Sequence, residues 1–271
     1  MQTDSSALAI GEDGFTVPLD AALRRIALLG QPGAGKSNGT TDLAEELLRR
    51  NQVVVVIDYK GDFWGLRSKY PIAIFGGDHA DLELRPDAGA SIADSIVANR
   101  YPAVIDCSEI YDRDELVQLI TAFASRMFFA KRSDPRPIHI IFDEVDQFCP
   151  EQPAKGEIEM ARSVERLAKL GRKRGIGVSL TTQAPASVSK RLLEICDLIF
   201  FMQLSGRNTL KAVVETLQNK ISDEQMLELK RGVAQLQLGE AYAWSPGWLR
   251  IASPHRFEAT MCCGCGAVIV S

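Results

Sequence analysis

The chain has 271 residues, of which 46% are hydrophobic and 24% charged, a composition typical of a folded protein and sufficient for one large α/β domain. Its formal net charge of −4 excludes a protein that coats nucleic acid with its whole surface, but not one that contacts DNA through a local basic stripe. The sequence shows no apolar run of about 18 residues and no signal-peptide pattern, so we expect a cytoplasmic protein without a membrane partner.

The first predicted strand, 26–29, leads into a stretch, 30–37, that matches G-x-x-x-x-G-K-S at every fixed position. A strand before this motif and a helix after it are the context in which it binds a polyphosphate. Backbone N–H groups of the glycine loop and the dipole of the following helix, 40–50, would both favour the anion. Lys36 would reach the β- and γ-phosphates, and the Ser37 hydroxyl would ligate Mg²⁺. The predicted nucleotide-binding residues are Gly30, Gln31, Pro32, Gly33, Ala34, Gly35, Lys36, Ser37 and Asn38.

The next run, Val53–Ile57, is apolar on both faces, which predicts an interior strand of a parallel sheet covered by helices. It ends at Asp58-Tyr59-Lys60-Gly61, so polar groups lie at the carboxyl edge of the sheet, where open α/β sheets bind ligands. A less regular region with a short apolar piece at 72–75 follows; beyond it a strand is predicted at 103–106, and helices at 90–99 and 114–130. Strands that alternate with helices predict a mainly parallel, doubly wound sheet flanked by helices.

An acidic pair, Asp143-Glu144, follows the apolar strand Ile138–Phe142. Hydrolysis at a phosphate loop needs a carboxylate near the metal and a group that orients the attacking water. We expect Asp143 to hold Mg²⁺ through its water shell and Glu144 to polarise the water. Acidic residues are also common at solvated strand ends, so the pair predicts a hydrolytic site only in combination with the upstream phosphate loop.

Downstream of the acidic pair, a helix is predicted at 157–174 and a strand at 176–181, followed by Gln183. If that strand lies beside the Asp143 strand, the Gln183 amide would lie near the γ-phosphate; otherwise it is an ordinary amide at a strand end. The helix carries a basic stripe that is either a solvated face or a phosphate-binding one: Arg162, Arg166, Lys169 and Lys173. Helices at 187–195, 208–218 and 223–229 and β segments at 198–202, 234–238 and 241–244 complete the prediction.

Asp58-Tyr59-Lys60-Gly61 also fits D-x-x-G, which raises a GTPase as an alternative. Guanine recognition would then call for Asn-Lys-x-Asp late in the chain. The stretch 219–223 reads Asn-Lys-Ile-Ser-Asp, one residue too long, and a shift of one residue at a helix start turns the carboxylate away. The sequence therefore disfavours a GTPase.

Together, the stretches 30–37, 55–62, 141–144, 171–177 and 181–185 resemble the motifs of the HerA/FtsK-type P-loop ATPases, closest to the HerA-like helicase or translocase group. The resemblance covers about residues 15 to 250. It implies a RecA-like P-loop NTPase domain of the ASCE class, with ATP and Mg²⁺ as cofactors. It also implies a homo-oligomeric ring, usually a hexamer, with double-stranded DNA in its pore.

The resemblance further implies roles for individual residues. Arg172 aligns with the arginine that members donate in trans to the γ-phosphate of the neighbouring subunit, Arg207 is a second candidate, and Gln183 matches the sensor glutamine. The expected organisation is a flexible N-terminal segment at 1–15, a RecA-like ATPase domain at 16–252 and a C-terminal tail at 253–271. No role is assigned to the cysteines of that tail, Cys262, Cys263 and Cys265.

From these features we predict an ATP-hydrolysing, ring-forming motor that translocates along double-stranded DNA or unwinds it. The alternative is a regulatory or scaffold ATPase ring that acts with a protein partner such as a nuclease, in a defence or packaging complex. A small-molecule P-loop kinase lacks support, because no arginine-rich lid follows Asp143 apart from the basic helix. DNA-dependent ATPase activity would separate the first two functions.

Overall fold

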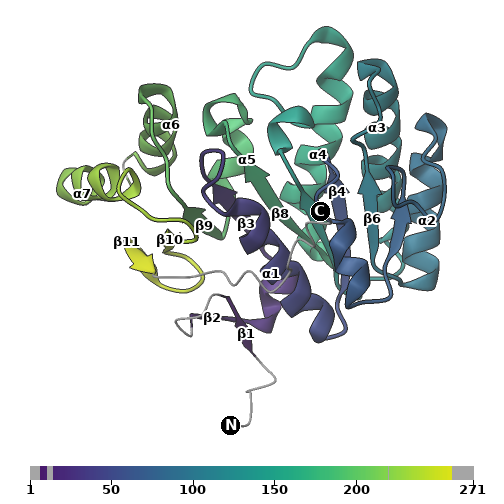
Figure 1. Ribbon diagram of the computed structural model, residues 1–271, viewed down its shortest axis with the longest axis horizontal. Helices are drawn as coiled ribbons and strands as arrows, with labels where there is room; N and C mark the ends of the chain where they lie inside the picture. The colour runs from purple at the N-terminus through teal and green to yellow at the C-terminus, as the bar shows by residue number, and fades with distance from the viewer. Residues whose placement is uncertain (1–6, 11–14, 219, 258–271) are drawn as a thin grey trace, which may run out of the picture.

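The computed structural model describes residues 7–10, 15–218 and 220–257. Its centre is a nine-stranded sheet in the order β11-β10-β9-β3-β8-β7-β4-β6-β5, with a separate two-stranded sheet, β1-β2 (Figure 1). Seven neighbouring strands, from β9 to β5, run parallel, whereas β10 and β11 are antiparallel additions at one edge. The strands are β1 Ala7–Ala9, β2 Thr16–Pro18, β3 Arg25–Leu29, β4 Val53–Asp58, β5 Ala73–Phe75, β6 Ala103–Asp106, β7 Ile138–Phe142, β8 Ile176–Thr182, β9 Leu198–Phe201, β10 Ala241–Ser245 and β11 Ile251–Phe257.

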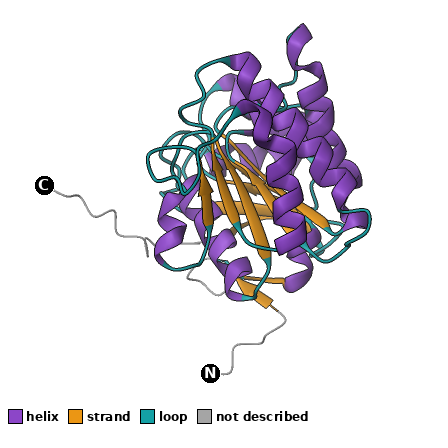
Figure 2. Cartoon of the chain, turned by 90° about the vertical axis from the view of Figure 1, so that its right-hand side faces the viewer, coloured by secondary structure: helices purple, strands orange, loops and turns teal. Residues whose placement is uncertain are grey.

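Helices cover both faces of the large sheet, as Figure 2 shows. Helices α2, α3 and α4 stand side by side at one end of the molecule, and α6 and α7 lie at the other end (Figure 1). The helices are α1 Lys36–Arg49, α2 Gly89–Asn99, α3 Arg113–Ala130, α4 Ile158–Leu170, α5 Lys190–Glu194, α6 Arg207–Leu217 and α7 Asp223–Val233. This architecture confirms the mainly parallel α/β fold that the alternating pattern predicts.

Two hydrophobic cores lie on opposite faces of the sheet because neighbouring residues of a strand point in opposite directions. In β4, Val53, Val55 and Ile57 enter one core, and Val54 and Val56 enter the other. All six residues of β4 are buried, as expected for a strand apolar on both faces. The two-sided burial fixes the register of the central strands, and so fixes which residues emerge at their carboxyl ends.

The ends of the chain depart from the prediction. Strand β1 lies inside the segment 1–15 that we expected to be flexible, because Leu8 and Ile10 are buried in the core that contains α1. Strand β11 runs to Phe257 and so crosses the expected boundary at 252. The Cys262–Cys265 stretch lies outside the described residues.

Two internal elements are also corrected. The stretch 234–238, expected as a β segment, is a turn region between α7 and β10. The predicted helix 157–174 ends as an α-helix at Leu170 and continues as a 3₁₀ helix, Gly171–Arg174, which closes on Gly175 in the left-handed conformation at φ 75°. Over a single turn, the spacing of apolar side chains does not distinguish an α-helix from a 3₁₀ helix, so the sequence pattern does not predict this change.

No helix in the described part of the chain combines the length and the apolar character needed to cross a membrane.

His139 gives the fold a pH dependence. The side chain is fully buried in β7, where Nε2 lies 2.7 Å from Ser179 Oγ and Nδ1 lies 3.2 Å from the Ala22 carbonyl oxygen. Burial lowers its pKa from 6.5 to about 4, because the charged ring would lose its hydration. The unfolded chain therefore takes up a proton near pH 6.5, while the folded chain stays neutral until about pH 4. Stability is lost as the pH falls through this window.

We expect His139→Gln, which cannot titrate, to lose less stability than the wild type between pH 7 and pH 4.5, by about 2 kcal/mol. Urea unfolding of both proteins at the two pH values measures this difference. Equal losses in the two proteins would show that His139 does not cause the acid sensitivity.

Candidate nucleotide site

The loop 30–37 connects β3 to α1 at the carboxyl edge of the sheet. Gly33 and Gly35 have φ angles of 76° and 95°, values that residues with a side chain rarely adopt. The loop is held to its neighbour strand by a hydrogen bond of 2.8 Å from the Gln31 N–H to the Gln203 carbonyl. The backbone is thus shaped as an anion-binding loop at the start of a 14-residue helix.

Lys36 is the first residue of α1 and is 7% exposed. Its ammonium group donates to the Gln31 carbonyl at 3.1 Å, which folds the side chain back over the loop. Burial lowers its pKa, and the Glu144 carboxylate opposes that shift. Ser37 is exposed directly after it. The Lys36 ammonium group and the Ser37 hydroxyl therefore belong to consecutive residues where the loop enters α1.

Asp143 follows β7, two strands away from β3. One of its carboxylate oxygens accepts a 2.6 Å hydrogen bond from the Thr181 hydroxyl on β8. The other oxygen, Oδ2, is buried and has no hydrogen-bond partner among the described residues. Burial raises the Asp143 pKa to about 6. A buried, unpartnered carboxylate oxygen is costly unless a cation or its water shell meets it, so the donor set fits Mg²⁺.

Glu144 has φ 50° and ψ 59°, a left-handed backbone that costs a residue other than glycine roughly 1 kcal/mol. Its backbone N–H donates to the Thr181 hydroxyl at 3.1 Å. The Gln183 N–H donates to Oε2 at 3.1 Å, and the Gln183 side-chain amide donates to Oε1. The strained turn thus aims this carboxylate along the sheet edge toward β8, beside Asp143.

Lys60, which follows β4, also pairs with Oε1 of Glu144. Its loop is shaped by Asp58, a fully buried carboxylate that accepts the backbone N–H groups of Gly61 and Phe63, both at 2.8 Å. The D-x-x-G pattern therefore has a structural role here: Asp58 folds the loop so that Lys60 reaches Glu144. Sequence reasoning missed the contacts of Lys60 and Thr181 with Glu144, although both residues lie in stretches it singled out, because a motif does not record the direction of these side chains.

The structure brings together Lys36, Asp143, Glu144 and Gln183 through the strand order β3-β8-β7. Gln183 directly follows β8, which pairs with both β3 and β7 in parallel, as the placement beside the Asp143 strand requires. Arg172 lies elsewhere. It is exposed in the 3₁₀ helix that precedes β8, at the amino edge of the sheet and so opposite its own phosphate loop. Arg207 begins α6, and its side chain lies outside the described part of the chain.

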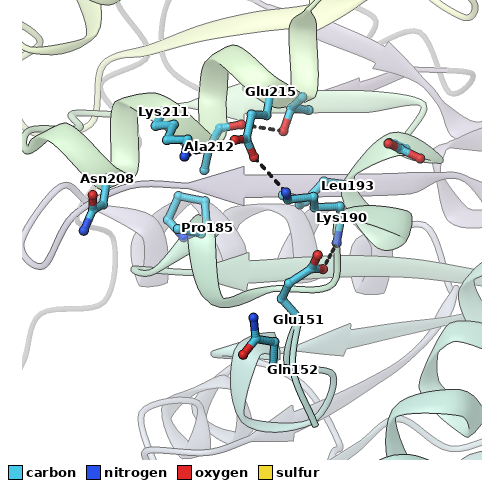
Figure 3. Close-up of a pocket in the computed structure, with 12 residues that line it drawn as sticks. Glu151, Gln152, Pro185, Lys190, Leu193, Asn208, Lys211, Ala212 and Glu215 are labelled. Carbon is cyan, nitrogen blue, oxygen red and sulfur yellow. Dashed lines mark hydrogen bonds and ion pairs between the residues drawn. The ribbon is translucent and has the colours of Figure 1, made fainter.

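A separate cavity of about 330 Å³ lies between the loop after β7, α5 and α6 (Figure 3). None of its lining residues belongs to the phosphate loop. Among its charged groups, Lys190 Nζ lies 2.9 Å from Glu215, and the Lys190 backbone N–H donates to the Glu151 carboxylate at 2.8 Å (Figure 3). The glutamates of this cavity, Glu151, Glu194 and Glu215, outnumber its lysines, Lys190 and Lys211, so the loop 30–37 remains the better candidate for a polyphosphate.

The chain is similar to known proteins in part of its sequence and in its fold. Residues 8–120 match the family model described as "Helicase HerA, central domain", which includes the phosphate loop and Lys60 and ends before Asp143. A search of curated proteins finds no match.

Solved structures resemble the whole described fold. VirB4 of Thermoanaerobacter pseudethanolicus is 12% identical, with a TM-score of 0.64 over 94% of this chain and 96% of that one. The bacterial conjugative coupling protein TrwBdeltaN70 is 13% identical, with a TM-score of 0.61 over 89% and 87% of the two chains. The genome packaging NTPase B204 of Sulfolobus turreted icosahedral virus 2, in complex with ATP-gammaS, is 15% identical, with a TM-score of 0.53 over 86% and 95%. Residues 8–120 thus resemble the central domain of the HerA helicase family, and the fold of the described chain is similar to that of these solved structures.

Proposed function

We propose that the protein is an ATP-hydrolysing, ring-forming motor that moves or unwinds double-stranded DNA. The observation that carries ATP hydrolysis is the meeting of the loop 30–37 with Asp143, Glu144 and Gln183 at one edge of the sheet. A phosphate loop alone binds nucleotide, whereas a second carboxylate beside a metal-binding one can also activate water.

In this proposal the backbone N–H groups of the loop and the Lys36 ammonium hold the phosphates. Ser37 and Asp143 are the residues that would hold Mg²⁺, which when bound supplies positive charge against the phosphate oxygens. Glu144 accepts a proton from the attacking water. Gln183 and Lys60, which already contact Glu144, fix the direction of that carboxylate.

The DNA part of the proposal has separate support. The chain is similar in fold to a genome packaging NTPase and to a conjugative coupling protein, and part of it matches the HerA helicase family. Arg162, Lys169 and Lys173 are exposed on and just after α4, so most of the basic stripe faces solvent, although Arg162 lies 4.0 Å from Glu159. We propose a homo-oligomeric ring, a hexamer, working in the cytoplasm with ATP and Mg²⁺.

We expect long double-stranded DNA to stimulate the ATPase rate of the purified protein at least several-fold at low salt. Low salt is needed because contacts from a few lysines and arginines to phosphates weaken steeply as salt rises. Lys36→Ala serves as the control that lacks nucleotide binding. A measurable rate that DNA leaves unchanged would contradict a DNA motor and favour a ring that acts on a protein partner, such as a nuclease.

A further inference from the structure

The turn between α7 and β10, residues 236–240, lies directly against the phosphate loop. The Gly239 N–H donates to the Ala34 carbonyl at 3.2 Å. A Cβ placed on Gly35 would lie 3.2 Å from the Gly239 nitrogen and 3.4 Å from Leu238 Cδ1. Two segments about two hundred residues apart in sequence thus touch backbone to backbone where a nucleotide would bind.

The turn is built as a fixed support. Leu236 is 1% exposed in the core, and Gly239 adopts φ 84°. The Glu240 carboxylate accepts the Gln237 N–H at 2.7 Å, and the Glu240 N–H donates to the Gln237 carbonyl at 3.1 Å. Leu238, at the tip of this braced turn, is 63% exposed. Most of this apolar side chain is thus held in solvent beside the anion-binding loop.

The strand order shows on which side of the phosphate loop the 236–240 turn lies. Asp143, Glu144 and Gln183 lie beyond β3 in the direction of β8 and β7. The 236–240 turn leads into β10, which lies beyond β3 in the opposite direction, past β9. The water-activating groups must face the terminal phosphate, so the other end of the nucleotide extends away from them. That end is the nucleoside. The 236–240 turn and the nucleoside therefore lie on the same side of the phosphate loop.

We propose that Leu238 is the base-contacting residue of a nucleoside subsite, and that it packs its exposed side chain on the face of a purine ring. The polar groups of a purine lie at the edge of its ring, so the flat face can cover an exposed leucine, and the contact removes apolar surface from water. The inference rests on the proposed nucleotide binding and adds to it which part of the chain holds the nucleoside.

The test compares ADP with inorganic pyrophosphate, both with Mg²⁺, by titration calorimetry. Both ligands use the phosphate loop, but only ADP brings a base, and neither is turned over. Leu238→Ala should weaken ADP binding about tenfold and leave pyrophosphate binding unchanged. Leu238→Met, which keeps an apolar side chain of similar length, should retain the affinity for ADP.

Leu82→Ala is the matched control, since Leu82 is 60% exposed and lies beside β5 at the far edge of the sheet. Unchanged ADP binding in Leu238→Ala would overturn the inference. Equal weakening of ADP and pyrophosphate would also overturn it, because the turn would then support the phosphate loop and not the base. A wild-type protein that binds neither ligand would overturn the proposed function itself, a result distinguishable from the other two.

Discussion

Replacing Glu144 by Gln is expected to lower ATP turnover at least about 100-fold and to change the Kd for ATP by less than about threefold. Glu144 is the carboxylate that a strained backbone and contacts from Gln183 and Lys60 hold beside the phosphate loop. A neutral amide of the same shape cannot accept a proton from water. It does not remove the loop, Lys36 or Asp143, on which nucleotide binding depends.

The measurement is steady-state ATP turnover together with equilibrium binding of ATP to the same preparation. Asp146→Asn is a suitable control, because Asp146 lies two residues further on and accepts a 2.6 Å hydrogen bond from Thr182. We expect that variant to keep most of its turnover. If Glu144→Gln hydrolyses ATP at the wild-type rate, another group activates the water, and the proposed mechanism is wrong.

The sequence predicted those parts of the site that follow from parallel strands. Val53–Asp58 and Ile138–Phe142 are apolar on both faces, so their carboxyl ends had to meet at one edge of the sheet, the edge at which the loop 30–37 follows β3. The same rule applies to Gln183. It follows β8, and because β8 lies between β3 and β7, Gln183 lies beside the end of the Asp143 strand.

Contacts that depend on side-chain direction were not predictable. The Thr181 hydroxyl bridges Asp143 and Glu144 only because β7 and β8 pair in one register, which the periodicity of either strand leaves open. The approach of Gly239 to Ala34 joins segments far apart in the chain, and no motif marks it. The 234–238 stretch alternates apolar and polar residues, a pattern that also fits a strand, but Leu236 enters the core from a turn region.

Arg172→Ala is expected to bind nucleotide like the wild type and to lose at least about 100-fold in turnover, since a trans-acting arginine offsets transition-state charge. Arg172 is exposed at the amino edge of the sheet, opposite the phosphate loop of its own subunit, so a direct role at the γ-phosphate requires a second copy of the chain. Arg132→Ala, which removes an exposed cation from the loop that precedes β7 at the same edge of the sheet, is the control that should retain turnover.

Mixing two inactive variants tests the assignment to a neighbouring subunit. Lys36→Ala subunits cannot hold nucleotide but still carry Arg172, and Arg172→Ala subunits hold nucleotide but lack the arginine. In a mixed ring, an Arg172→Ala site next to a Lys36→Ala subunit has every group it needs, so turnover should return to a measurable fraction of the wild-type rate. Recovery cannot occur if each subunit supplies its own arginine or if Arg172 only stabilises its subunit. Mixed rings that form and stay inactive would therefore remove Arg172 from the active site.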